Sequence, residues 1–249
     1  MVLIVNKAVN ENQRKIKLVK LIKLLLTLLV VICANSFPLR ALAAPNVAEI
    51  ANNVASNIKS MHILQVDLNI EMFDAKGKAQ NMSGRVTVDQ KKKITRLEIL
   101  EHSIFKGQII VVDILNDEAI VYMPVTSAAV IGKIKTVGSQ LGQVDLTSLN
   151  MDELLSLDPA DILNMKYIKT EEYDRHSHYV IEVKTNISGS GTQIVWVDAE
   201  TNLVKKVEVF DDLGRNIANV VTENFKWNFS YDFKQLKELP KDAKLTSLR

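Results

Sequence analysis

Apolar and polar residues alternate along much of the chain, which is the pattern of β-strands with one buried and one solvated face. The clearest run covers residues 64–72, where the even positions are apolar and the odd positions are polar. A turn around Gly77 follows, and a second alternating run over residues 85–89 returns beside the first. These two runs predict a β-hairpin with one face on a core.

Further strand-like runs continue almost to the end of the chain. They cover residues 94–100, 108–114, 119–124, 166–173, 179–184, 193–198, 203–211 and 217–229, and residues 244–248 are a candidate edge strand. The strands do not alternate with long helices, as they would in a doubly wound parallel sheet. The sequence therefore predicts a mainly β protein, an antiparallel sandwich or barrel of about ten strands.

Two segments depart from the strand pattern and are predicted to be helical. Residues 47–61 repeat apolar side chains at spacings of three and four, as an amphipathic helix with one buried stripe does. Residues 150–165 are predicted to hold two short helices, one capped by Asn150 and one beginning with Pro159. Residues 127–146 have no clear period and are predicted to be a mobile connection, stranded in part.

The two short helices are rich in Leu and Met, so each has an apolar side to bury. They either plug one end of the sheet's core or form a movable lid over an apolar cavity, where Met adapts to irregular ligands. The candidate lid residues are Met151, Leu154, Leu155, Ile162, Leu163 and Met165.

The N-terminal region has the order of a secretory signal peptide. A basic stretch at residues 14–23 precedes an apolar run at residues 24–34, and small residues at Ala41 and Ala43 form a cleavage site. The alternative is an uncleaved anchor, but the apolar run is shorter than a membrane-spanning helix requires. We therefore predict a signal peptide at residues 1–43, cleavage after Ala43, and a single exported domain at residues 44–249, in a bacterial periplasm.

Charge and cysteine content narrow the function further. The chain holds 31 basic and 29 acidic residues, and seven of the basic residues and one acid fall within residues 1–43. The predicted mature domain is therefore mildly acidic, which removes the electrostatic basis for binding nucleic acid. Cys33, the one cysteine, lies inside the signal, so disulfides and cysteine chemistry are not expected in the mature protein.

Motifs that would carry catalysis or bind metal are not found in the sequence. The histidines, His62, His102, His176 and His178, do not form a zinc-binding motif, and "SGSG" at residues 188–191 indicates a hairpin turn rather than a nucleophile elbow. The basic residues 91–93 are expected to form a solvated turn. We therefore expect a binding protein rather than an enzyme, without a metal or cofactor.

Three stretches resemble the outer-membrane lipoprotein carrier LolA and its lipoprotein-sorting relatives. They are "VWVDAETNLVKKVEVFDDLGR", "GQIIVVDILNDEAIVYMP" and "LPKDAKL". The resemblance implies an incomplete antiparallel β-barrel, with an N-terminal amphipathic helix and short lid helices covering an apolar concave face. It also implies a ligand and a route: the acyl chains of lipoproteins or other lipid cargo, received from an inner-membrane transporter and passed to an outer-membrane acceptor by a monomer.

The resemblance also implies which residues line the lipid-binding cavity. The candidate residues are Leu64, Val66, Leu68, Ile70, Val86, Val88, Leu97, Ile99 and Trp196. Trp196 lines the cavity if its side chain points inward and packs against the N-terminal helix or the tail if it points outward. The carrier has an Arg-Pro pair after its first hairpin where this chain has "DQKKK" at residues 89–93, so Lys91 would supply the charge there without a bidentate fork.

Three functions remain open from the sequence. The first is a periplasmic carrier that shields the acyl chains of lipoproteins and moves them toward the outer membrane. The second is an envelope-stress sensor of the RseB type, which binds mislocalised lipoproteins and a membrane anti-sigma partner. The third is an exported structural domain whose interior is filled by its own side chains.

Overall fold

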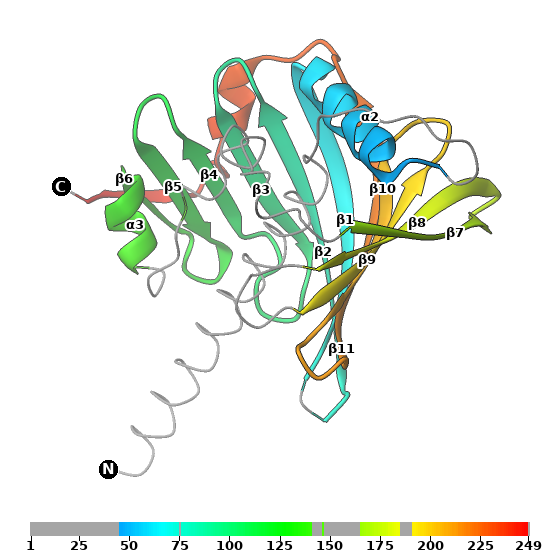
Figure 1. Cartoon of the computed structure of the whole chain (residues 1–249). Coiled ribbons are helices and arrows are strands. Elements are labelled where there is room, and N and C mark those ends of the chain that lie inside the picture. The colour runs from blue at the N-terminus through cyan, green and yellow to red at the C-terminus, as the bar shows by residue number, and fades with distance from the viewer. Residues whose placement is uncertain (1–44, 75, 141–145, 147–164, 185–190, 249) are drawn as a thin grey trace.

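A single antiparallel sheet dominates the computed structural model, which describes residues 45–74, 76–140, 146, 165–184 and 191–248. Its twelve strands lie in the order β12-β6-β5-β4-β3-β2-β1-β11-β10-β9-β8-β7, so β12 and β7 form the two edges (Figure 1). Only β12, beside β6, pairs in parallel among the strands described. The sheet is curved but not closed, which confirms the predicted mainly β fold of the incomplete-barrel type.

The bounds of the strands follow the predicted runs closely. They are β1 (Ile63–Phe73), β2 (Ala79–Asp89), β3 (Ile94–Glu101), β4 (Ile109–Asp113), β5 (Glu118–Met123), β6 (Ala128–Lys133), β7 (Met165–Tyr173), β8 (His176–Lys184), β9 (Thr192–Asp198), β10 (Val204–Phe210), β11 (Asn216–Trp227) and β12 (Lys244–Ser247). A short 3-10 helix, η1 (Pro124–Thr126), connects β5 to β6.

The sequence prediction was wrong in two places. Residues 134–140, expected within a mobile connection, form helix α3 (Ile134–Gln140), whereas strand β6 fits the expectation that this connection is stranded in part. Met165, expected at the end of a short helix, is the first residue of strand β7. The predicted signal peptide and the other candidate lid residues lie outside the described residues.

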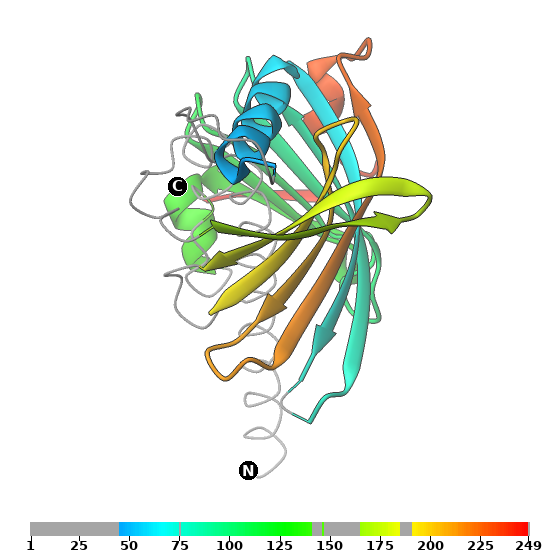
Figure 2. The ribbon, with the colours of Figure 1, turned by 45° about the vertical axis from the view of Figure 1, so that its right-hand side comes forward.

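Helix α2 (Val47–Ser60) lies across the concave side of the sheet (Figure 2). It begins at Asn46, whose side chain accepts a hydrogen bond from the backbone N–H of Ala48 at 3.0 Å. Ile50, Val54 and Ile58 form its buried stripe and join the core of the sheet. The amphipathic period predicted from the sequence therefore describes this helix and the face that it buries.

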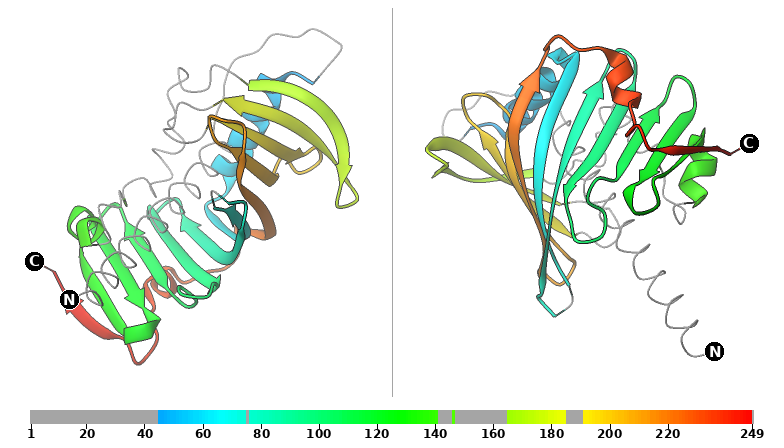
Figure 3. Two further views of the ribbon diagram at one scale, coloured as in Figure 1. Left: turned by 90° about the horizontal axis from the view of Figure 1, so that it is seen from below. Right: turned by 180° about the vertical axis from the view of Figure 1, so that it is seen from behind.

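The C-terminal segment covers part of the opposite face, which we call the outer face. After β11 the chain crosses behind the sheet through the 3-10 helix η4 (Phe233–Lys237) and continues into β12 (Figure 3). Leu236 is fully buried there against a second apolar cluster, which includes Ile109, Val111 and Ile120. The sheet therefore has a packed layer on each side, with α2 on one and the C-terminal segment on the other.

Candidate functional site

The aliphatic residues predicted to line a cavity lie together on the concave face. Leu64, Val66, Leu68 and Ile70 of β1 belong to one buried apolar cluster with the stripe of α2. The same cluster contains Val86 and Val88 from β2. Leu97 and Ile99 of β3 complete the predicted set. Alternation along each strand brings these side chains to one face, as the period of two requires.

The apolar face extends across the other half of the sheet in rows of directly paired residues. One row consists of Ile181, Val195, Val207, Val220, Ile70 and Met82. A second row, nearer the start of β9, consists of Met165, Val183, Gln193, Val209, Ala218 and Met72. Neither row contains an acid or a base, and every side chain of the first row is buried.

Two uncharged polar side chains interrupt the concave face of β9 and β11. The hydroxyl of Thr222, which lies opposite Leu68, donates a hydrogen bond to the carbonyl oxygen of Val204. Gln193 lies between Val183 and Val209 and is 0% exposed, and neither atom of its amide has a hydrogen-bond partner. The sequence prediction overlooked Gln193, although it has the same strand parity as Val195 and Val197.

The prediction that Trp196 lines the cavity is wrong, because the side chain points to the outer face. Its neighbours Val195 and Val197 belong to the concave cluster, so strand alternation turns Trp196 the other way. The indole N–H donates a hydrogen bond to Glu171, and the ammonium of Lys206 lies 4.5 Å from the ring centroid. Lys169 and then the Trp196 N–H lower the pKa of the Glu171 carboxyl, so this cluster is stabilised by charge.

Only one of the predicted lid residues can be placed. Met165 begins β7, and its half-buried side chain packs against the concave cluster. Met151, Leu154, Leu155, Ile162 and Leu163 lie outside the described residues. Lys91, considered as a substitute for the carrier's arginine, lies exposed in the turn between β2 and β3, where Asp89 accepts a hydrogen bond from the N–H of Lys92.

Titratable groups also gather where β8 meets the turn that follows β9. The Asp198 carboxylate is buried and lies 3.8 Å from Nδ1 of His176 and 3.9 Å from Nε2 of His178. Burial works to raise the pKa of Asp198, but hydrogen bonds from the backbone and side chain of Thr201 and the backbone of Glu200 outweigh it and lower the pKa. These bonds shape the β9–β10 turn, so we assign Asp198 a structural role.

Two observations on the described part of the chain concern metal binding and membrane crossing. There, no group of three His, Cys, Asp or Glu side chains is arranged to hold a metal ion. No helix in the same part of the chain is long and apolar enough to cross a membrane.

Comparison with solved structures finds proteins of similar fold. An uncharacterised conserved protein from Thermus thermophilus has a TM-score of 0.55 and 15% identity, over 80% of this chain and 98% of that one. Lipoprotein LppX from Mycobacterium tuberculosis has a TM-score of 0.46 and 14% identity, over 74% of this chain and 96% of that one. A LolA superfamily protein from Nitrosomonas europaea has a TM-score of 0.32 and 14% identity, over 69% and 88%.

These comparisons concern the fold and not the ligand. No protein-family model matches the chain, and no curated protein matches it significantly. The Thermus protein is similar to this chain in fold over nearly its whole length.

Proposed function

We propose that the protein is a non-enzymatic periplasmic carrier, which binds the acyl chains of lipoproteins on its concave face and moves them toward the outer membrane. The observation that supports this proposal is the continuous row of Ile181, Val195, Val207, Val220, Ile70 and Met82. The row crosses the sheet without a charged side chain, as a site for hydrocarbon requires.

The size of the hydrophobic effect makes acyl chains suitable ligands for such a face. Each CH₂ group removed from water contributes about 0.8 kcal/mol, so an acyl chain gains several kcal/mol from partial burial. Contact with aliphatic side chains has no directional demand, so chains of different length and saturation can bind. An inner-membrane transporter and an outer-membrane acceptor are the partners that the sequence resemblance implies, and the predicted signal peptide supplies the export.

Native mass spectrometry of protein produced from the full chain tests the proposal. A tripalmitoylated lipopeptide is offered to delipidated protein, and the same peptide without acyl chains serves as the ligand control. We expect a one-to-one complex with the lipopeptide alone. A protein that remains empty with both peptides would contradict lipid binding.

Two matched substitutions then test the face. Val195 lies on the concave side of β9, and Val180 lies on the outer side of β8, directly opposite Trp196; both are buried. We expect Val195→Phe to weaken lipopeptide binding about tenfold, roughly the loss of two CH₂ contacts, and Val180→Phe to leave it unchanged.

The unfolding free energies of the two variants separate a carrier from a domain with a filled core. Overpacking a filled core costs about 1–3 kcal/mol, so Val180→Phe should show this loss. If the concave face accepts lipid, Val195→Phe should lower the unfolding free energy of the delipidated protein by less than Val180→Phe does. Equal losses for both variants, without any effect on lipopeptide binding, would support the structural-domain interpretation instead.

A further inference from the structure

Gln193 is the side chain on the concave face whose hydrogen bonds are unaccounted for. It is 0% exposed, its direct neighbours across the sheet are Val183 and Val209, and neither its amide oxygen nor its amide nitrogen has a partner. Elsewhere in the described chain, the buried unpartnered atoms are single atoms, on Asn52, His178 and Asn216. In Gln193 the whole carboxamide lacks partners.

Such an arrangement is unusual in a folded protein, because more than about 90% of buried polar groups are hydrogen-bonded. A carboxamide brings two N–H donors and an accepting oxygen, and each unmade bond carries a desolvation penalty. Thr222 shows the normal solution on the same face, since its hydroxyl bonds to the carbonyl oxygen of Val204. A partner for Gln193 must therefore come from outside the described residues.

We propose that Gln193 is the polar contact for the head of the bound lipid, meaning the ester and amide groups that join acyl chains to a lipoprotein's N-terminal residue. This inference rests on the proposed function and names the chemistry of its ligand. The Gln193 amide nitrogen donates to an ester or amide carbonyl, and its oxygen accepts from an amide N–H. A plain hydrocarbon can use neither interaction.

The position of Gln193 along the strand fits an amphiphile. It is the second residue of β9, and Val195 and Val197 follow on the same face at about 7 Å for every two residues. The far end of β9 lies beside α2, where Asn57 donates a hydrogen bond to the carbonyl oxygen of Thr201. The acyl chains would therefore extend from Gln193 toward α2.

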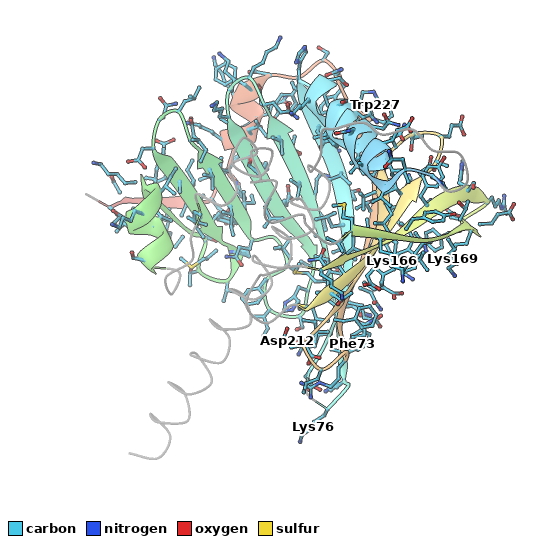
Figure 4. The ribbon with its side chains drawn as sticks, viewed as in Figure 1. Phe73, Lys76, Lys166, Lys169, Asp212 and Trp227 are labelled. Carbon is cyan, nitrogen blue, oxygen red and sulfur yellow. The ribbon has the colours of Figure 1, made fainter. Side chains whose placement is uncertain are left out.

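In Figure 4, Asp212 and Trp227 mark the two ends of the sheet between which β9 runs, and Trp227 lies at the end near α2. Gly191, two residues before Gln193, lies against the backbone of Asp211 and Asp212, so the polar contact belongs to the Asp212 end. Because Gln193 is fully buried, a ligand reaches it only after local opening of the protein. We therefore expect bound lipid to exchange with free lipid at a rate set by this opening, below the rate of diffusional encounter.

Gln193→Met tests the inference, because it keeps the length of the side chain and removes its polar atoms. In the full-length protein, we expect the Kd for a tripalmitoylated lipopeptide to rise about fivefold to tenfold. The Kd for a pyrene-labelled alkane, which has no ester or amide, should stay unchanged. The Tm of the delipidated variant should rise by about 2–4 °C, since an unsatisfied buried amide has been removed.

Val183→Met is the matched control, because Val183 lies beside Gln193 in the same row and has no polar atom. It should change the Kd values of both probes by the same factor. If Gln193→Met leaves lipopeptide affinity unchanged, or weakens both probes equally, the side chain is an ordinary wall residue and the inference fails. A lower Tm with unchanged affinity would show that internal water satisfies Gln193, which also overturns it.

The same measurements separate this failure from a failure of the proposed function. If the wild-type protein binds the lipopeptide and Gln193→Met binds it equally well, only the role of Gln193 is lost. If the wild-type protein binds neither probe, lipid binding and the role of Gln193 fall together.

Discussion

Lys237 holds the C-terminal segment to the outer face, and its removal gives a sharp test of the packing described above. Its ammonium lies 2.6 Å from Oδ2 of Asp113 and 2.8 Å from Oε1 of Glu118. The Asp113 side chain is almost fully buried and also accepts hydrogen bonds from the backbone N–H and side-chain amide of Asn116. Lys237→Met would leave the Asp113 carboxylate buried without its cation.

We expect this substitution to cost about 2–3 kcal/mol at pH 7. Removing one partner of a fully buried ion pair costs about 3–5 kcal/mol, and we take a lower value because Lys237 is 30% exposed and the bonds from Asn116 remain. A double variant, Asp113→Asn with Lys237→Met, should recover much of this loss, because it leaves no buried charge.

The pH dependence has a defined sign. Burial acts to raise the pKa of Asp113, but the bonds from Lys237 and Asn116 outweigh it and hold that pKa below its ordinary value of 3.8. The bonds of Lys237 to Asp113 and Glu118 likewise outweigh burial and raise the pKa of Lys237 above 10.5. The contribution of Asp113 is therefore present above its unfolded pKa and lost as the pH falls through its lower folded pKa. The contribution of Lys237 is present below its unfolded pKa and lost as the pH rises through its higher folded value.

In Lys237→Met the burial effect on Asp113 is no longer opposed by a cation, so the pKa of that carboxyl rises. As the pH falls, Asp113 is therefore protonated at a higher pH in the variant than in the wild type, and its protonation removes the buried unpaired charge that destabilises the variant. Urea unfolding followed by circular dichroism at pH 7 and pH 4 measures both free energies. Lys234→Met, on the same short helix, is the control and should stay within about 0.5 kcal/mol of wild type. The reasoning would be refuted if Lys237→Met lowered the unfolding free energy by less than about 0.5 kcal/mol at pH 7, or by the same amount at both pH values.

Three further predictions concern other parts of the fold. Leu236→Ala should cost about 2–5 kcal/mol in urea unfolding, since Leu236 is 0% exposed, whereas Leu245→Ala on the exposed edge strand β12 should cost little. Trp227→Phe should remove most acrylamide-quenchable emission, since Trp227 is 48% and Trp196 7% exposed; strong quenching of the variant would contradict the placement of Trp196. Gly214→Ala should lower stability by about 1 kcal/mol in the same urea assay because Gly214 has a φ of +74°, although a Cβ meets no atom within 4 Å.

Strand alternation made most of the fold predictable from the sequence. The run at residues 64–72 gave the right face for Leu64, Val66, Leu68 and Ile70, because a period of two leaves one choice of buried face. Helix α3 was missed because "IKTVGSQ" contains β-branched residues and a glycine, which are poor helix formers. It forms nevertheless, and its Ile134 and Val137 pack into the concave cluster, so tertiary packing overrides local propensity here.

The errors at the candidate site have a different cause. Trp196 was named as a cavity candidate with its face left open, although the parity of Val195 and Val197 places it on the outer face. Gln193 shares the parity of those valines and was overlooked because a lone glutamine carries no motif. Its lack of partners depends on Val183 and Val209, which come from other strands and are not evident from local sequence.

The polar interactions of the sheet are distributed unequally between its two faces, and this bears on function. The Arg85–Asp67 pair, the Lys206–Glu208 pair and the Trp196 cluster use the strand parity opposite to that of the concave residues. Lys237 likewise pairs with Asp113 and Glu118 on the outer face, where Nε2 of His178 is a buried atom without a hydrogen-bond partner. On the concave face, Thr222 meets its need internally and Gln193 does not. On a face that serves only as a core, an apolar residue at position 193 would give more stability than an unpartnered carboxamide, so the carboxamide at this position fits the proposal of a ligand that bonds to it.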